Sequence, residues 1–207
     1  MTFTITLLII AFTALVSIKG FSDTGFRHKL IFNPYIIKND KEYFRFLTSG
    51  FLHADWIHLF VNMYVLYIFG TYLEAIYDNI FEKGGRLLYI LMYLSAIVMA
   101  NISTYFKWKE SPTYNALGAS GAVSAVLFAT ILFDPTQKLI LLFLPIPMPA
   151  VLLGGLYLVY SIIMSRRGGD NINHEAHFYG ALYGFLFTGM LRPHLFLSFF
   201  EQVKEMF

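Results

Sequence analysis

The sequence predicts an all-α membrane protein: a bundle of six transmembrane helices with a long first loop in the membrane interface. Of its 207 residues, 57% are hydrophobic and only 14% are charged, so a soluble domain of this composition could not cover its surface with polar groups. The hydrophobic residues also gather into helix-length runs that end at charged residues, Asn, Gly or Pro. This length suits one bundle, so we expect residues 1–207 to form a single domain without a separate soluble part.

The composition also excludes several classes of function. The chain has no cysteine, which rules out disulfides, thiolate metal sites and cysteine nucleophiles. No basic run is interleaved with aromatic residues, so we expect no nucleic-acid partner. The apolar start has neither a basic n-region nor a small-residue cleavage site, so we expect it to remain as the first membrane helix.

The six expected spans follow one another along the chain. They cover Thr2–Ile18, Trp56–Ile76, Arg86–Phe106, Gly118–Phe133, Ala150–Met164 and Ala176–Leu191. Several are shorter than the ~20 residues that a membrane-spanning helix needs, and short spans leave room for water-filled cavities.

The segments between the spans are expected to lie in the membrane interface. Lys19–Asp55 is rich in aromatic and basic residues, and we expect a short amphipathic helix within it at Phe44–Leu47. The apolar run Leu139–Leu144 is too short to span and should lie flat as a connector. The tail to Phe207 is expected to form a short interfacial helix.

Ser120 lies between glycines at the expected start of the fourth span. Helix N-termini carry unpaired N–H groups and a partial positive charge, so an oxyanion formed beside this serine would meet ready-made donors. Ser120 is therefore a candidate nucleophile. The alternative is that Gly118 and Gly121 are packing residues at the start of a membrane helix, which is the commoner use of small residues there.

His177 opens the sixth span and is followed on the same helix face by Gly180 and Gly184. Such a face can pack closely against the small residues of the fourth span. In that case His177 would come within hydrogen-bond reach of Ser120 and could act as its general base. A purely structural histidine is the alternative.

His58 and Asn62 are four residues apart and therefore lie on one face of the second span. Both side chains can donate hydrogen bonds, which suits an oxyanion site, although a packed interhelical hydrogen bond would use the same residues. Four histidines, His53, His58, His174 and His177, raise the question of a metal site. The histidine spacings do not match a zinc motif, so we expect no metal and no cofactor.

Other polar residues have structural explanations. We expect Glu74 to cap or pair at the end of the second span, and Arg45 to anchor the first loop through headgroups or loop carbonyls. Ser124 should pack or bond back to its own helix. Tyr157 and Tyr160 should line a cavity or face lipid.

These residues together resemble the rhomboid intramembrane serine proteases. The resemblance covers Arg45–Glu74, the Gly118–Gly121 motif, and Ala176–His177 with the two glycines that follow, in the family's order on the second, fourth and sixth spans. One departure is Phe44, where many members have tryptophan before the arginine, and it concerns the anchoring of the loop.

The resemblance implies a rhomboid-like bundle in which Ser120 is the nucleophile and His177 the general base, a dyad without an acidic third member. It also implies that His58, Asn62 and the backbone N–H of Ser120 hold the oxyanion. The residues given structural roles near the site are Gly118, Gly121, Gly180, Gly184, His53 and Arg45.

The implied activity is cleavage of the transmembrane segments of substrate proteins within a lipid bilayer. We expect a multi-pass integral protein of a bacterial inner (plasma) membrane with a cytoplasmic N-terminus, although the Lys and Arg residues of the loops do not favour this orientation. Two other functions stay open: a catalytically inactive rhomboid-like protein that binds membrane helices, and a small transporter that uses the buried His and Asn. The sequence predicts no oligomeric state.

Overall fold

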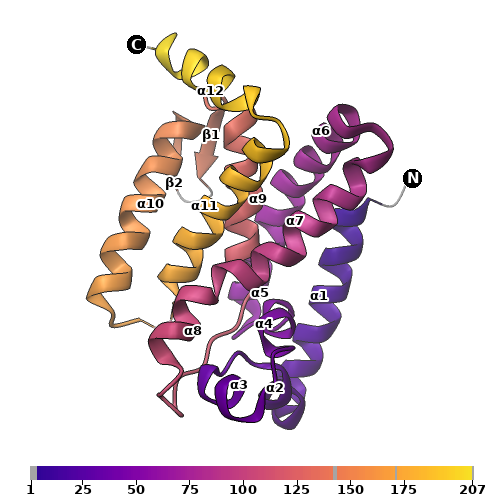
Figure 1. Ribbon diagram of the computed structural model, residues 1–207, viewed down its shortest axis with the longest axis vertical. Helices are drawn as coiled ribbons and strands as arrows, with labels where there is room; N and C mark the ends of the chain where they lie inside the picture. Colours follow the sequence, from indigo (N-terminus) through magenta and orange to yellow (C-terminus); the bar gives the residue numbers. More distant parts are fainter. Residues whose placement is uncertain (1–3, 142–143, 171, 207) are drawn as a thin grey trace.

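The computed structural model describes residues 4–141, 144–170 and 172–206, and most of them are helical. Figure 1 shows helix α9 (Ser120–Phe133) in the centre of the bundle, with α7 (Gly85–Ala100) and α11 (His174–Leu191) packed against it. Helices α1 (Ile5–Ser22) and α10 (Ala150–Arg167) lie on opposite sides. The central position of α9 follows from its sequence, since small or apolar side chains surround the whole helix.

The second and third spans are continuous helical stretches with local irregularities. Helix α5 (Trp56–Val65) continues through one π turn, η2 (Leu66–Gly70), into α6 (Thr71–Phe81). The 3-10 turn η3 (Glu82–Gly84) leads into α7, and α8 (Ile102–Trp108) follows. By length and composition, Ile5–Ser22, Trp56–Trp108 and Ala150–Arg167 could cross a membrane, and α9 is a shorter apolar helix.

These elements confirm the all-α membrane fold class. The helices match the expected spans to within a few residues at most ends, and the expected start at Thr2 lies outside the described residues. The largest extension is in the second span, where α6 reaches Phe81 instead of ending at Ile76.

The first loop is more structured than the sequence predicts. It contains α2 (Thr24–Leu30), α3 (Pro34–Asp40), α4 (Arg45–Thr48) and the 3-10 turn η1 (Ser49–Phe51). Helix α4 falls at the expected amphipathic segment. Figure 1 shows α2 and α3 at one end of the bundle, near α8.

The expected flat connector is instead part of a small antiparallel hairpin of β1 (Lys138–Leu141) and β2 (Leu144–Pro149), with residues 142–143 outside the description. Every second residue of β2 is a proline, and proline has no backbone N–H. One edge of the strand therefore has no hydrogen-bond donors. The other edge keeps its donors and pairs with β1, with Leu139 opposite Met148. Helix periodicity alone gave no sign of this pairing.

The tail forms α12 (His194–Lys204), as expected, at the end of the bundle opposite the first loop (Figure 1). Phe207 lies outside the described residues. The Gln202 Nε2 donates a hydrogen bond to the backbone oxygen of Phe133, the last residue of α9. The tail helix therefore covers the exposed carbonyl end of the central helix.

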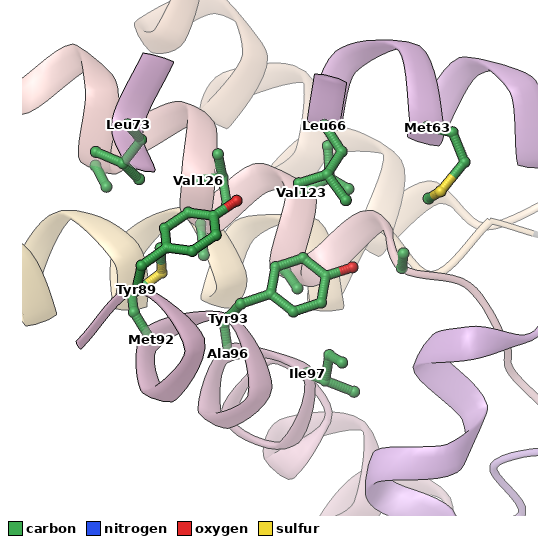
Figure 2. Close-up of a cluster of buried hydrophobic side chains, with 14 of the residues drawn as sticks. Met63, Leu66, Leu73, Tyr89, Met92, Tyr93, Ala96, Ile97, Val123 and Val126 are labelled. Atoms are coloured by element: carbon green, nitrogen blue, oxygen red, sulfur yellow. The ribbon is translucent and has the colours of Figure 1, made fainter. Parts of the chain in front are cut away.

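The main core lies between α7, α9 and the second span. Figure 2 shows the rings of Tyr89 and Tyr93 reaching from α7 toward Leu66 and toward Val123 and Val126 of α9. Inside a bilayer such contacts stabilise through close packing and dispersion, because lipid tails are as apolar as the side chains they replace.

Glu74 pairs with the start of the first helix. Its carboxylate accepts hydrogen bonds from the backbone N–H groups of Ile5, at 2.7 Å, and Thr6, at 2.9 Å, and from the Thr6 hydroxyl at 2.8 Å. These are donors that the first turn of a helix leaves unpaired. The expected capping role of Glu74 is therefore confirmed, but the helix that it caps is α1.

Two glycines of α11 bring it into direct backbone contact with α9. A Cβ atom at Gly180 would lie 2.1 Å from the backbone oxygen of Gly121, and one at Gly184 would lie 2.0 Å from that of Ala125. Real Cβ atoms do not approach so closely, so only glycine fits at either position. This is the small-residue contact that the sequence predicts.

We expect Gly184→Ala to destabilise the protein by at least about 3 kcal/mol, the upper end of typical overpacking costs, because backbone atoms cannot move aside easily. Gly155→Ala is the matched control, since its Cβ would meet nothing within 4 Å. The measurement is unfolding of both variants in mixed micelles. Equal stability of the two variants would contradict the close contact.

Candidate active site

Ser120 and His177 meet at the heads of the two central helices. Ser120 is the first residue of α9 and His177 lies in the first turn of α11. The Ser120 Oγ and His177 Nε2 are 2.8 Å apart, within hydrogen-bond distance. The two side chains expected to form a dyad are therefore in the geometry that proton transfer from serine to histidine requires.

Local structure fixes both residues. The side chain of Asn173 caps α11 by accepting a hydrogen bond from the Ala176 N–H, which sets the first turn that holds His177. Ahead of Ser120, Gly118 has φ +129°, a conformation that L side chains rarely adopt. A Cβ at Gly118 would also lie 2.8 Å from the His58 Cε1. The turn before the serine thus needs glycine on both grounds.

His58 lies against this turn, and its hydrogen bonds indicate its protonation. The Ala54 N–H donates to the His58 Nδ1 at 3.5 Å, so the neutral ring carries its proton on Nε2. Because His58 lies close to Gly118, its ring is beside the turn that precedes Ser120.

Asn62 is buried one turn further along α5. Its Nδ2 donates one hydrogen bond to the backbone oxygen of His58 at 2.9 Å. A carbonyl can only accept, which fixes the orientation of the amide and leaves its second N–H available to another acceptor.

His53 supports the turn of residues 118–119 that precedes Ser120. The Ser17 hydroxyl donates to the Phe51 carbonyl, so its 2.9 Å contact with the His53 Nδ1 has the histidine as donor. The His53 Nε2 is then free to accept from the Ala119 N–H at 3.5 Å. Burial, followed by the nearby His58, lowers the pKa of His53 to about 3, which keeps this acceptor unprotonated.

The first loop is tied to the segment that leads to the serine. Phe32 and Ala116 exchange two backbone hydrogen bonds, and the Gly118 N–H donates to the Ser49 carbonyl at 3.0 Å. Arg45 is buried and holds the loop itself by donating to the carbonyls of His28, at 2.7 Å, and Ile31, at 3.0 Å. Of the two anchoring roles expected for Arg45, the structure contains the contacts with loop carbonyls.

Tyr157, one of the two tyrosines that were expected to line a cavity or face lipid, contacts the candidate dyad. The ring of Tyr157 on α10 stacks on His177, with centroids 6.2 Å apart and planes at 16°. Its hydroxyl is 2.6 Å from the Ser124 Oγ, which in turn donates to the Ser120 carbonyl at 2.8 Å. The expected bond of Ser124 back to its own helix is thus present. Tyr160 is 52% exposed, which fits the expected position facing lipid, and its ring also meets that of His174 edge to face.

A small recess of about 20 Å³ lies beside Ser120 and is lined by Gly118, Gly121, Asn101 and Asn173 among others. Sequence reasoning missed both asparagines. Asn173 could have been found, because an asparagine immediately before an apolar helical run is a typical N-cap. Asn101 carries no such signal, since it lies at the break between α7 and α8.

The four histidines that raised the question of a metal are arranged differently. His53 and His58 meet edge to face, as do His174 and His177. Within residues 4–141, 144–170 and 172–206, no group of three or more His, Cys, Asp or Glu side chains could hold a metal ion.

Comparison with known proteins gives a consistent picture. The family profile described as Rhomboid domain matches residues 40–194, well over half of the chain. RHOMBOID-like protein 12, mitochondrial, of Arabidopsis thaliana is 30% identical over 75% of this chain and 50% of its own length. Rhomboid-like protein 11, chloroplastic, of the same plant is 29% identical over 89% of this chain and 65% of its own.

The human presenilin-associated rhomboid-like protein, mitochondrial, is 33% identical over 67% of this chain and 35% of its own length. The chain thus spans between about a third and two thirds of the length of these curated relatives.

The lowered pKa of His53 gives a testable dependence of stability on pH. In the unfolded chain His53 regains its ordinary pKa of 6.5, whereas in the folded chain the pKa is about 3. Between these values the unfolded state binds a proton that the folded state does not, so stability falls as the pH is lowered from 6.5 toward 3.

We expect His53→Gln to flatten this fall, because glutamine does not titrate and can still accept from Ala119. Thermal unfolding in detergent between pH 7 and pH 4 measures it. His28→Gln, at an exposed position on α2, is the control and should keep the wild-type profile. Equal slopes in all three proteins would contradict the role given to His53.

Proposed function

The chain belongs to the rhomboid family, and on that premise we propose that it is an intramembrane serine endopeptidase. Its substrates are membrane proteins, which it cleaves within or beside a transmembrane segment. Ser120 is the nucleophile and His177 the general base. The relatives are longer than this chain, so the activity is proposed for the chain itself, from its own side chains.

The observation that carries the proposal is the 2.8 Å contact between the Ser120 Oγ and the His177 Nε2. In the proposed reaction His177 accepts the hydroxyl proton as Oγ attacks the carbonyl carbon of the scissile bond. It then gives that proton to the leaving amine, and an acyl-enzyme remains on Ser120. A water molecule, deprotonated by the same imidazole, releases the new carboxyl end of the substrate.

We assign three donors to the point where the oxyanion would form. The Nε2–H of His58 and the free N–H of Asn62 come from α5, and the backbone N–H of Ser120 belongs to a first turn that leaves its amides unpaired. The partial positive charge at the head of α9 adds to them. Preorganised donors of this kind are the largest single contribution to catalysis in many acyl-transfer enzymes.

The depth of the serine supports a transmembrane substrate. Helix α9 has 14 residues, so at 1.5 Å per residue it spans ~21 Å, less than the ~30 Å of a bilayer core. Its head at Ser120 therefore lies below the membrane surface if its other end is near the opposite face. A helical substrate hides its carbonyls, so segments weakened by Gly or Pro should be cleaved best. The small recess beside Ser120 favours a small side chain before the cut.

The chain is a multi-pass membrane protein, and the identity of its membrane is a separate matter. The sequence-based expectation is a bacterial plasma membrane. The relatives described above carry mitochondrial and chloroplastic names, so they give that expectation no support, and it stays a prediction.

We expect Ser120→Ala and His177→Ala each to abolish detectable cleavage of a single-span substrate by purified protein in liposomes, because each removes one partner of the proton transfer. Ser165→Ala and His194→Ala are the matched controls. Ser165 lies near the end of α10, and His194 is exposed at the start of α12. Both controls should cleave at the wild-type rate.

Three outcomes would contradict the proposal. Cleavage that survives in Ser120→Ala would mean that another group does the chemistry. No cleavage by the wild type, together with capture of the intact transmembrane peptide, would favour an inactive member of the family that binds membrane helices. Ion flux that continues in Ser120→Ala liposomes would favour the transporter.

We expect Asn62→Ala to lower kcat by on the order of 10²–10³, the usual loss for one oxyanion donor, while KM changes little. Asn39→Ala, at an exposed position on α3, is the control. Steady-state cleavage of a fluorogenic single-span substrate gives both constants. A loss confined to KM would assign Asn62 to substrate binding instead.

A further inference from the structure

Tyr157 contacts His177 directly and is linked to Ser120 through Ser124. It makes these contacts from a third helix, α10. We propose that Tyr157 is a positioning residue that fixes the relative placement of Ser120 and His177, so that the reaction rate depends on how α10 is docked. This inference rests on the proposed protease function and names a determinant of the same site.

The hydrogen-bond chain to Ser120 has a defined direction. Ser124 has one hydroxyl proton, and it donates that proton to the Ser120 carbonyl at 2.8 Å. In the 2.6 Å contact between Ser124 and Tyr157, the tyrosine is therefore the donor. This series of hydrogen bonds runs from Tyr157 through Ser124 to the backbone of Ser120, and it holds the first turn of α9 to α10.

The stacking contact fixes the histidine. The Tyr157 and His177 rings are nearly parallel, at 16°, with centroids 6.2 Å apart, which is an offset stacking geometry. The hydrogen bond between the Ser120 hydroxyl and His177 leaves the imidazole free to turn about its own bonds. The flat face of Tyr157 limits that turning, and it keeps the His177 Nε2 aimed at the serine.

Tyr157 is on a helix with little other attachment to the core. Helix α10 buries only Ala150, Gly154 and Ser161, and its place at the side of the bundle is visible in Figure 1. Gly154 lets α10 approach Phe128 and Ile131 of α9, where a Cβ would lie 3.0 Å from Ile131. A displacement of α10 would therefore break both contacts of Tyr157 at once, while the backbone contact of α9 with α11 would persist.

Three variants separate the two contacts. Tyr157→Phe keeps the ring and loses the hydroxyl, Ser124→Ala removes the link to Ser120, and Tyr157→Leu removes the ring. Tyr160→Leu, one turn along α10 at an exposed site, is the matched control. Tyr157→Phe preserves the volume of the side chain, so it tests the inference even if the leucine variant folds poorly.

Each rate is divided by the concentration of protein whose Ser120 reacts with a fluorophosphonate, so that misfolded protein does not contribute. We expect Tyr157→Leu to lower kcat about 10²-fold, the loss typical of a small misplacement of reacting groups, with KM within about threefold of wild type. Tyr157→Phe and Ser124→Ala should each lose about five- to tenfold in kcat. Their double variant should lose no more than the larger single loss, because one chain of hydrogen bonds is broken only once.

Two kinetic results would overturn the inference while leaving the protease function intact. One is a Tyr157→Leu kcat within threefold of that of Tyr160→Leu. The other is full additivity of Tyr157→Phe and Ser124→Ala, which would make the two side chains independent.

A second measurement decides the inference if the wild type does not cleave, in which case the proposed function itself has failed. Protein labelled with 15N-histidine gives the ring signals of His177 by solid-state NMR in liposomes, assigned by their loss in His177→Gln. These signals should shift in Tyr157→Leu and stay in place in Tyr160→Leu. An unchanged His177 signal in Tyr157→Leu would overturn the positioning role.

Discussion

The backbone contact between α9 and α11 is the constraint on which the rest of the structure depends. Gly180 and Gly184 place α11 against the carbonyls of Gly121 and Ala125, closer than any side chain would permit. Because Ser120 and His177 lie at the heads of these same helices, the helix spacing also sets the distance between hydroxyl and imidazole. Glycines without side chains therefore set the spacing of the two helices, and the role proposed for Tyr157 is to hold the two reacting groups in position within that spacing.

The other half of the site depends on the first loop, which acts as a frame for the serine turn. Ser49 accepts from the Gly118 N–H, His53 accepts from the Ala119 N–H, and Phe32 pairs with the strand-like segment just before them. Arg45 is buried in the loop and satisfies its carbonyls. A long segment between two spans is thus ordered by contacts with the chemical centre, which fits the rule that long connections in compact folds are usually functional.

The features that the sequence predicted are those carried by a local pattern. The spacing of His177, Gly180 and Gly184 is such a pattern, and so is the run of small residues in α9. The features that could not be predicted from the sequence depend on partners far apart in the chain or on a change from helix to strand. Glu74 finds its donors 68 and 69 residues away, at the start of α1. The β1–β2 hairpin forms in a proline-rich run without helical periodicity. The direction of Tyr157 depends on the packing of a helix that has almost no polar face.

Covalent labelling tests the central claim most directly, because it reports whether the hydroxyl of Ser120 is activated by the imidazole of His177. Native protein is treated with a fluorophosphonate, digested and mapped by mass spectrometry, alongside protein unfolded in SDS and the His177→Ala variant. We expect the adduct on Ser120 in the native protein and not in the other two samples. An adduct on another residue, or equal modification of Ser120 without His177, would contradict the account.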